Sequence, residues 1–223
     1  MQNLAQYIDH TLLKPTATEM DFRKLCEEIY THNFYSACVP PHYVSFVKDI
    51  LVYSQAKVCT VIGFPLGYQT TSTKLTEAER ALADGANELD MVMNINAFKS
   101  MAYLTVKQEI RELADLTHSK SALLKVIIET AYLDNFDLSI ACEICEEAGA
   151  DFVKTSTGFA PKGADVEQVR LMRHNLPDTV RIKASGGIQT YEQALAFIEA
   201  GAARLGTSSG VAILKGGVGI GEY

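Results

Sequence analysis

Eight short apolar segments recur along the 223-residue chain, and segments with helical spacing separate most of them. Strands that alternate with helices predict a parallel β-sheet, because each helix returns the chain to start the next strand in the same direction. Eight such units in a chain of this length favour an α/β fold of the single-domain (β/α)8 TIM-barrel type. An open, doubly wound sheet is the alternative. The expected strands are 7–13, 34–40, 57–64, 87–94, 123–130, 151–156, 180–186 and 202–208.

Helix boundary signals agree with this alternation. Helical spacing is found in 18–32, 105–118 and 135–149. In the last of these, Phe136, Ile140 and Ile144 share one helical face. Thr190 is expected to cap the start of a later helix, and Gly201 to end it.

The whole chain, 1–223, is expected to form this one domain, because no long polar linker interrupts the alternation. The glycine-rich end, "KGGVGIGEY" over 215–223, predicts a mobile C-terminal tail. The formal net charge is −7, and the lysines and arginines form no run. This argues against a nucleic-acid or anionic membrane partner, whereas a small anionic substrate still fits a locally positive site.

The cellular location is expected to be the cytoplasm. The first residues, "MQNLAQYIDHTLLKP", lack the basic and apolar regions of a signal peptide, and no run of 18 apolar residues occurs. The cysteines are five, an odd number that favours free thiols in a reducing compartment. Cys142 and Cys145 form a CxxC pair inside an expected helix, where we interpret them as small core residues rather than a redox or metal pair.

Charged side chains interrupt five of the expected strands at positions flanked by apolar residues. They are Asp9, Asp90, Lys125, Lys154 and Lys183, and Thr11 shares the parity of Asp9. Lysine is seldom buried without a partner, and the working end of a (β/α)8 barrel lies where its strands end. A single such lysine is often part of a structural ion pair or reaches solvent with its ammonium. Three on consecutive strands, with aspartates available, instead indicate a reactive cluster.

The chemistry of such a cluster is that of a lysine amine attacking a carbonyl. Desolvation or a neighbouring cation frees a lysine amine, which then forms a Schiff base, and the protonated Schiff base withdraws electrons from the adjacent carbon. A second lysine and an aspartate can move the protons. No cofactor or metal is required, and the five histidines show no HxH or HxxxH spacing.

Two glycine-rich stretches, "ASGGIQT" (184–190) and "LGTSSGVAIL" (205–214), follow the seventh and eighth expected strands. Loops at these places form the recurrent phosphate site of such barrels, because glycine lets backbone N–H groups approach an anion closely. Each pair taken alone is also compatible with an ordinary turn. Together they predict a phosphate site.

The motifs "IDHTLLKP", "ELDMVMNI", "LLKVIIET", "FVKTSTGF", "IKASGGI" and "LGTSSG" closely resemble those of the deoxyribose-phosphate aldolase family of class I aldolases. They occur in the family's order from residue 8 to about residue 210. The resemblance implies a (β/α)8 barrel and the reversible cleavage of 2-deoxy-D-ribose 5-phosphate to D-glyceraldehyde 3-phosphate and acetaldehyde, in deoxynucleoside catabolism. It implies no cofactor.

The resemblance also implies roles for individual residues. Lys154 matches the Schiff-base lysine, Lys183 the second lysine that assists it, and Asp90 the acid that exchanges protons. The positions of the surrounding polar network are Asp9, Thr11 and Lys125. The positions where the family binds phosphate are Gly158, Gly186, Gly187, Gly206, Ser208 and Ser209.

Three positions carry separate expectations. Phe159 stands where some members have a lysine, which removes one cationic contact to a phosphate. Cys38 lies near the end of the second expected strand, and we hypothesise that high aldehyde concentrations inactivate the enzyme partly through it. Tyr223 ends the chain, and in some members a C-terminal tyrosine assists proton transfer, although a frayed end fits equally well.

Two other functions are compatible with parts of the pattern. Another phosphate-binding barrel enzyme, such as an isomerase or a different Schiff-base aldolase, would share the glycine loops without requiring Lys154, Lys183 and Asp90 together. A catalytically silent sugar-phosphate sensor would be expected to have lost one of these residues. The expected partners are a small phosphorylated sugar, acetaldehyde and a second copy of the chain in a homodimer.

Overall fold

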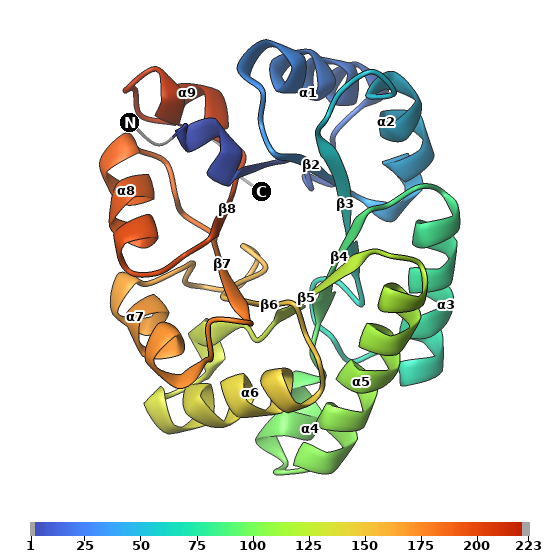
Figure 1. Cartoon of the computed structure of the whole chain (residues 1–223), viewed down its shortest axis with the longest axis vertical. Coiled ribbons are helices and arrows are strands. Elements are labelled where there is room, and N and C mark those ends of the chain that lie inside the picture. Colours follow the sequence, from blue (N-terminus) through green and yellow to red (C-terminus); the bar gives the residue numbers. More distant parts are fainter. Residues whose placement is uncertain (1–2, 220–223) are drawn as a thin grey trace.

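The computed structural model describes residues 3–219 and shows a closed barrel of eight parallel strands in sequence order, β1 to β8 (Figure 1). The predicted (β/α)8 barrel is therefore confirmed, and the open sheet is excluded. The strands are β1 (Ile8–Thr11), β2 (Ser36–Val39), β3 (Lys57–Ile62), β4 (Glu88–Val92), β5 (Leu123–Ile127), β6 (Phe152–Lys154), β7 (Arg181–Ser185) and β8 (Arg204–Thr207).

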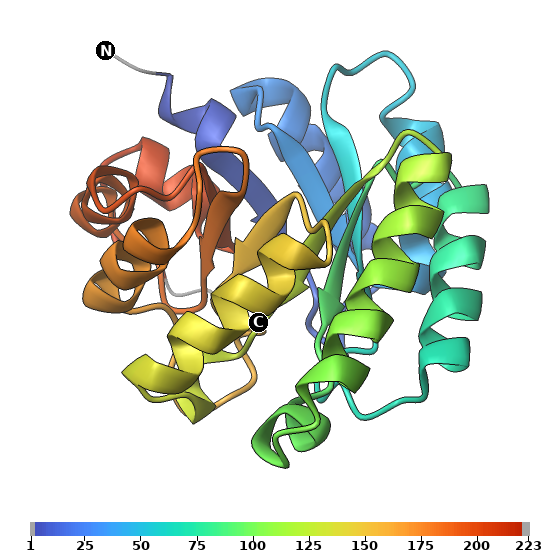
Figure 2. The ribbon, with the colours of Figure 1, turned by 60° about the horizontal axis from the view of Figure 1, so that its bottom comes forward.

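Helices surround the barrel on the outside. They are α1 (Glu19–His32), α2 (Val44–Ile50), α3 (Thr71–Ala83), α4 (Ile95–Lys99), α5 (Tyr103–Ser119), α6 (Asn135–Glu147), α7 (Val166–Asn175), α8 (Tyr191–Glu199) and α9 (Gly210–Leu214), with 3-10 turns η1 (Leu4–Tyr7), η2 (Pro41–Tyr43) and η3 (Thr130–Tyr132). Figure 2 shows α5 packed between α3 and α6. No helix within residues 3–219 combines the length and the apolarity that a membrane crossing requires.

The predicted helix ends are confirmed in α8. Thr190 caps its first turn, because its hydroxyl accepts a hydrogen bond from the backbone N–H of Gln193. In return, the Gln193 side chain accepts a hydrogen bond from the backbone N–H of Thr190. Gly201 follows the last turn with φ of 109°, a left-handed conformation that a residue with a Cβ seldom adopts. Local sequence chemistry therefore sets both ends of this helix.

The face predicted for α6 differs from the face that packs against the barrel. Phe136 is 73% exposed and Ile140 is half-buried, whereas Ile144 is buried. The helix instead buries Leu138, Ala141, Cys142 and Cys145. The interpretation of Cys142 and Cys145 as core residues is confirmed, since small thiols let α6 lie close to the sheet.

Several strands end earlier than their apolar runs predicted. The fifth run extended to 130, but β5 ends at Ile127, and Glu129 has a left-handed φ of 51°. The sixth run extended to 156, but β6 ends at Lys154. The residues beyond these ends are buried although they are not strand. They form the floor of the loops at the barrel mouth.

Apolar and charged side chains fill different parts of the protein interior. The main apolar core lies between the strands and the helices. A second, small apolar cluster of Leu13, Cys38, Cys59 and Val61 packs with Phe64. The inward positions of β4 to β8 carry buried charges instead, which is where the candidate site lies.

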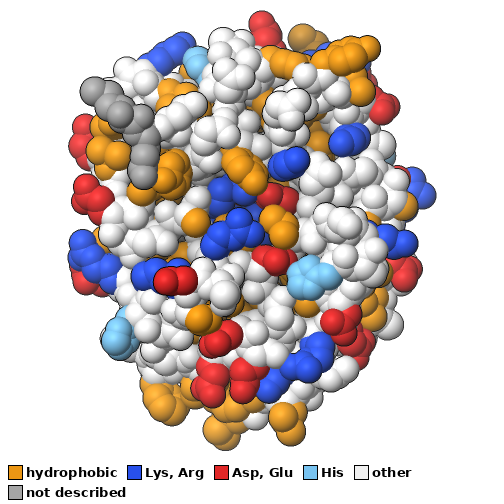
Figure 3. Space-filling view, in the orientation of Figure 1, with side chains coloured by type: hydrophobic (Ala, Val, Ile, Leu, Met, Phe, Trp, Pro, Cys, Tyr) orange, Lys and Arg blue, Asp and Glu red, His pale blue; other side chains and the backbone are white. Residues whose placement is uncertain are grey.

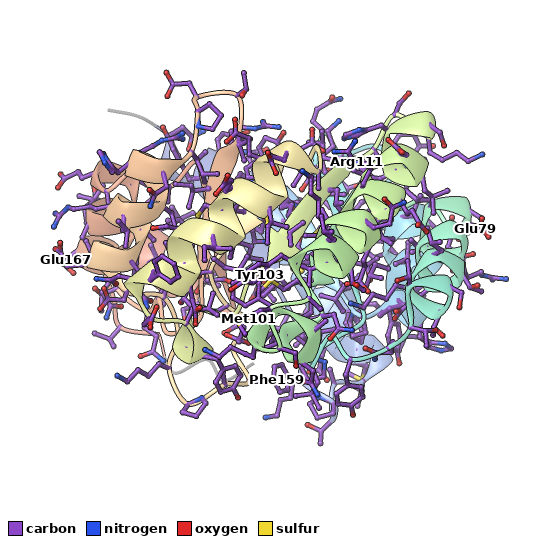
Figure 4. The ribbon with its side chains drawn as sticks, turned by 90° about the horizontal axis from the view of Figure 1, so that it is seen from below. Glu79, Met101, Tyr103, Arg111, Phe159 and Glu167 are labelled. Carbon is purple, nitrogen blue, oxygen red and sulfur yellow. The ribbon has the colours of Figure 1, made fainter. Side chains whose placement is uncertain are left out.

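The two ends of the barrel are filled differently. Figure 1 looks onto the end where the strands begin, with η1 in front, and Figure 3 shows side chains closing this face, with lysine and arginine side chains near its centre. At this end Arg204 stacks on the Tyr35 ring and Arg181 on the Phe152 ring. Phe159 lies at the opposite end, where it projects outward (Figure 4). The strand ends that bear the candidate site belong to this second end.

Candidate active site

The centre of the site is one carboxylate shared by two lysines. Asp90 on β4 is fully buried, and its Oδ2 accepts hydrogen bonds from Lys154 Nζ on β6 and Lys183 Nζ on β7, both at 2.8 Å. Lys154 and Lys183 are register partners on adjacent strands, so their side chains enter the lumen side by side. The structure thus brings together the three residues predicted as catalytic.

The other predicted polar residues support this centre. Asp90 Oδ1 accepts from Lys125 Nζ at 2.8 Å, and Lys183 Nζ pairs with Asp9 Oδ2 at 2.5 Å. Thr11 does not face the lysines through its hydroxyl, which donates to the Asp9 carbonyl oxygen at 2.8 Å. Thr11 therefore holds the backbone of β1, whereas Asp9 and Lys125 belong to the charge network.

Sequence reasoning missed two members of this network. Arg204 at the start of β8 donates from Nε to Asp9 Oδ1 at 2.7 Å, and its Nη2 lies 3.0 Å from Glu88 Oε2. Glu88 also pairs with Lys125 Nζ at 2.7 Å. Both residues could have been identified from the sequence, because each is a charged residue within an apolar run. Glu88 also shares the strand parity of Asp90.

The barrel lumen holds four buried cationic side chains and three buried carboxylates, so the formal charges balance only when one lysine is neutral. The buried cations are Lys125, Lys154, Lys183 and Arg204, and the buried anions are Asp9, Glu88 and Asp90. The cluster is neutral when Lys154 is a free amine, which still donates a hydrogen bond to Asp90. The lumen thus holds one more potential cation than its three carboxylates can compensate, and an uncompensated buried charge is costly.

Electrostatics fix the charges of the other two central residues. Burial opposes ionisation of Asp90, but Lys125, Lys154 and Lys183 together hold the pKa of its carboxyl well below the usual range. Burial likewise opposes the charge on Lys183, but Asp9 and Asp90 hold the pKa of its ammonium well above its ordinary value. In the resting site Lys183 is therefore a cation next to Lys154, and Asp90 is an anion that contacts both lysines.

Two loops meet near the predicted phosphate position. Gly158, Gly186 and Gly187 have φ of 91°, 90° and 77°, which favours glycine at all three. A Cβ on Gly186 would lie 2.9 Å from Gly163 Cα and 3.6 Å from Gly158 Cα. The loops after β6 and β7 therefore touch each other. Gly187 is exposed, and a Cβ at this residue would meet no neighbouring atom of residues 3–219 within 4 Å.

The eighth strand contributes residues of two kinds. Gly206 lies inside β8, where a Cβ would come within 3.0 Å of Lys183 Cε, so glycine at this position makes room for that lysine. Ser208 is half-buried in the following loop. Ser209 precedes α9, and its buried hydroxyl has no hydrogen-bond partner within residues 3–219. An anion accepting from Ser209 would satisfy it.

The loop after Lys154 is held by a carboxylate that the sequence analysis did not identify. Glu129, in its left-handed conformation, accepts from the Thr157 backbone N–H at 3.2 Å and from its hydroxyl at 2.5 Å. Burial raises the pKa of Glu129, against the two bonds from Thr157. In the sequence, Glu129 looks like an ordinary polar residue at the end of a strand. Its position directly after a buried apolar run is the only signal that could have indicated that it holds the Thr157 loop.

A cavity of about 120 Å³ opens beside this loop. Glu129, Thr157 and Phe159 line it together with residues of the loops after β3 and β4. Phe159 is 45% exposed and meets the Phe64 ring edge-on, with 5.3 Å between centroids. An aromatic contact thus occupies the position where some family members have a cation.

The two accessory predictions have different outcomes. Cys38 is buried as the register partner of Cys59, whose sulfur lies 3.1 Å from Asp90 Oδ1, so it borders the charge network. Tyr223 lies outside the described residues. Of the predicted tail 215–223, the described part ends with the Gly219 N–H donating to the Gln189 carbonyl at 2.9 Å.

Two groups of side chains within residues 3–219 have the spacing of metal ligands. They are Cys38, Cys59 and Asp90, and Asp9, Cys59 and Glu88. Each carboxylate in them already accepts hydrogen bonds or ion pairs from Lys125, Lys183 or Arg204. A cation would have to displace these partners, so the donor set fits an ammonium network better than a metal ion.

Comparisons with known proteins agree with this geometry. Residues 3–216 match the family described as DeoC/LacD family aldolase. The chain is 55% identical over 216 residues to the deoxyribose-phosphate aldolase of Thermococcus gammatolerans, covering 96% of each chain. It is 51% identical over 218 residues to that of Enterococcus faecalis, covering 98% of this chain and 99% of the relative.

Among solved structures, the barrel superposes on QR15, an aldolase, with a TM-score of 0.92 at 46% identity, covering 96% of each chain. The deoxyribose phosphate aldolase of Aeropyrum pernix, described as tetrameric, gives a TM-score of 0.89 at 38% identity, covering 95% of this chain and 89% of that one. The chain is therefore an enzyme that belongs to the DeoC/LacD family of aldolases.

Proposed function

We propose that this aldolase reversibly cleaves 2-deoxy-D-ribose 5-phosphate to D-glyceraldehyde 3-phosphate and acetaldehyde, with Lys154 as the Schiff-base nucleophile. One observation carries the mechanism. Lys154 is only 3% exposed, yet its Nζ hydrogen-bonds a carboxylate that already neutralises a second lysine. A buried amine that needs no charge for electrostatic balance is suited to attack a carbonyl.

The cleavage begins when the Lys154 amine attacks the C1 aldehyde of the open-chain sugar phosphate. Loss of water from the carbinolamine leaves a protonated iminium. The C2–C3 bond then breaks as the C3 hydroxyl loses its proton, its electrons move to the iminium, and D-glyceraldehyde 3-phosphate departs. Protonation of the remaining enamine at C2 and hydrolysis release acetaldehyde and restore the amine.

Asp90 and Lys183 move the protons in these steps, because both lie within hydrogen-bonding reach of the nitrogen or of one another. The positive charge of resting Lys183 also stabilises a developing alkoxide at C3. Asp9, Lys125 and Arg204 hold these two groups in place without touching the substrate.

The phosphate is proposed to lie at the loops after β6, β7 and β8. Gly158, Gly186 and Gly187 leave their backbone close to one another, and the buried Ser209 hydroxyl lacks a partner within the described residues. Ser208 adds a half-buried hydroxyl. With Phe159 in place of a cation, backbone N–H groups and hydroxyls carry more of this binding.

The proposal also covers domain organisation, assembly, cellular location and metabolic role. The chain acts as one domain, as a homodimer in the cytoplasm, and in deoxynucleoside catabolism. The tetramer described for the Aeropyrum pernix relative makes sedimentation analysis the direct test of assembly. A silent sugar-phosphate sensor is disfavoured, since Lys154, Lys183 and Asp90 are all present and in contact.

Borohydride trapping tests the mechanism. Reduction in the presence of acetaldehyde is expected to leave an N-ethyl group on Lys154, a gain of about 28 Da that peptide mass mapping locates. Lys154→Ala should abolish both this adduct and the cleavage of deoxyribose 5-phosphate. Lys74→Met is the matched control, because Lys74 is equally buried but pairs with Glu109 outside the lumen. An adduct on another lysine, or none in folded wild-type protein, would refute the mechanism.

A further inference from the structure

Two cysteines of the lumen face each other across neighbouring strands. Cys38 on β2 and Cys59 on β3 are direct register partners. Adjacent strands lie about 4.8 Å apart, within the range of Cα separations that a disulfide spans. Both side chains belong to the same small apolar cluster, and their sulfur atoms lie within 4.8 Å of one another. The two sulfurs therefore have to approach by less than about 3 Å to reach the roughly 2.05 Å of a disulfide bond.

We propose that Cys38 and Cys59 form a redox modification site, in which a hydroperoxide converts the two thiols into an intramolecular disulfide that reversibly lowers aldolase activity. The covalent step follows from the geometry of the pair alone. The loss of activity rests on the proposed function, because it acts through Asp90.

The two thiols differ in pKa, as disulfide formation through a sulfenic acid requires. When Cys38 ionises, the single Cys59 proton turns from Asp90 to the Cys38 sulfur, and this hydrogen bond, together with the charge of Lys183, lowers the pKa of Cys38 to about 7 against the effect of burial. Burial raises the pKa of Cys59 well above its ordinary value. Cys38 therefore supplies the thiolate, the form that attacks oxidants, and Cys59 supplies the proton and the second sulfur.

The reaction balances in two steps. The Cys38 thiolate attacks one oxygen of hydrogen peroxide, the O–O bond breaks, and the other oxygen leaves as water after taking up a proton, which gives a sulfenic acid. The Cys59 sulfur then attacks the Cys38 sulfur, and the hydroxyl group leaves as a second water with the Cys59 proton. The dithiol loses two electrons and the peroxide gains them.

A small oxidant has a route to the pair. Acetaldehyde must reach Lys154, and Lys154 and Cys59 contact the two oxygens of the same Asp90 carboxylate, at 2.8 and 3.1 Å. Hydrogen peroxide is no larger than acetaldehyde, so the opening that admits the substrate also admits the oxidant.

The consequence for catalysis runs through a hydrogen bond. Cys59 Sγ lies 3.1 Å from Asp90 Oδ1, and Lys125 Nζ lies 3.3 Å from the same sulfur. The disulfide removes the S–H donor and draws the sulfur toward β2. Asp90 then loses one of its partners while it still has to hold Lys154 and Lys183, so its carboxylate shifts away from the position that serves both.

The chain contains its own comparison pair. Cys142 and Cys145 are also buried, one helical turn apart on α6. Burial raises the pKa of Cys142 to about 12 against the opposing charge of Arg173, and burial together with Cys142 raises that of Cys145 well above its ordinary value. Under conditions that oxidise Cys38, this second pair is expected to stay reduced.

The experiment treats the full-length reduced protein with hydrogen peroxide, followed by alkylation, intact mass and non-reducing peptide mapping. We expect a loss of about 2 Da and a cross-linked peptide joining Cys38 to Cys59. Activity should fall on the order of tenfold, as for loss of one hydrogen bond to a charged group, and return with dithiothreitol. Each variant is compared with its own reduced form.

Cys59→Ser, whose hydroxyl can still donate a hydrogen bond to Cys38, should convert the response into an irreversible gain of about 32 Da at Cys38, because no second thiol intercepts the sulfenic acid. A Cys142→Ala/Cys145→Ala double variant should respond like wild type. A cross-link confined to Cys142 and Cys145, or no cross-link, would overturn the site. A Cys38–Cys59 cross-link with undiminished activity would overturn the inhibition. Failure of reduced wild type to cleave the sugar phosphate would instead refute the proposed function and leave the mass result to stand alone.

Discussion

Asp90→Asn tests whether one buried carboxylate organises the site. The substitution keeps the shape of the side chain but removes the charge that meets Lys125, Lys154 and Lys183, each with its Nζ 2.8 Å from a carboxylate oxygen. The lumen then holds an uncompensated positive charge even when Lys154 is a free amine. Removing one partner of a buried ion pair costs about 3–5 kcal/mol, so the folded-to-unfolded ratio should fall by roughly a thousandfold.

Catalysis should fall independently of this loss of stability. A group that moves protons in the transition state contributes about 10²–10⁴ in rate, and we expect kcat for deoxyribose 5-phosphate cleavage to fall by that factor in folded Asp90→Asn protein. Glu109→Gln is the matched control. Glu109 is also buried and pairs with Lys74 Nζ at 2.7 Å, but between the barrel and the outer helices. It should lose stability with unchanged kcat.

Two measurements make this comparison: urea unfolding for stability, and a coupled assay of glyceraldehyde 3-phosphate release for kcat. The pKa of Asp90 is depressed in the folded protein, so its stabilisation is full above the unfolded value of about 3.8 and declines as the pH falls further. The gap between wild type and Asp90→Asn should be equal at pH 5 and pH 7 and shrink below pH 4. Equal kcat losses in Asp90→Asn and Glu109→Gln, or a kcat within tenfold of wild type in Asp90→Asn, would refute the reasoning.

Three further outcomes are expected. Glu129→Ala should raise KM for the phosphorylated substrate about tenfold, because the Thr157 loop loses its acceptor, whereas Glu129→Gln retains a carbonyl oxygen and should keep KM; equal effects of the two would contradict this. Cys38→Ala should lose activity more slowly than wild type in concentrated acetaldehyde, and identical inactivation time courses would remove that hypothesis. Deletion of Tyr223 should slow exchange of the acetaldehyde methyl protons with deuterium followed by NMR, and unchanged exchange would show that the terminal tyrosine is not needed.

Several features were predictable because they depend on local patterns. The alternation of apolar runs with helical spacing predicted the closed barrel, and strand parity predicted that Asp90, Lys125, Lys154 and Lys183 point to one side. Capping chemistry predicted the ends of α8. These inferences hold because backbone geometry alone sets which neighbouring residues share a face.

The ends of the strands and the buried face of α6 were predicted less accurately. The ends of β5 and β6 were placed too late, since buried loop residues at the barrel mouth are as apolar or small as strand residues. The buried face of α6 was misjudged at Phe136 because an aromatic side chain at a helix start is as compatible with exposure as with packing.

The sequence by itself therefore determined the barrel, the lumenal charges and the family motifs. Tertiary structure decided how these charges are shared. Asp90 and Lys183 are 93 residues apart, yet closing the barrel places them 2.8 Å from each other. The same closure joins Arg204 to Asp9, and the register of β2 against β3 aligns Cys38 with Cys59. Sequence patterns report on neighbours along the chain, whereas contact between distant strands depends on the register in which the barrel closes.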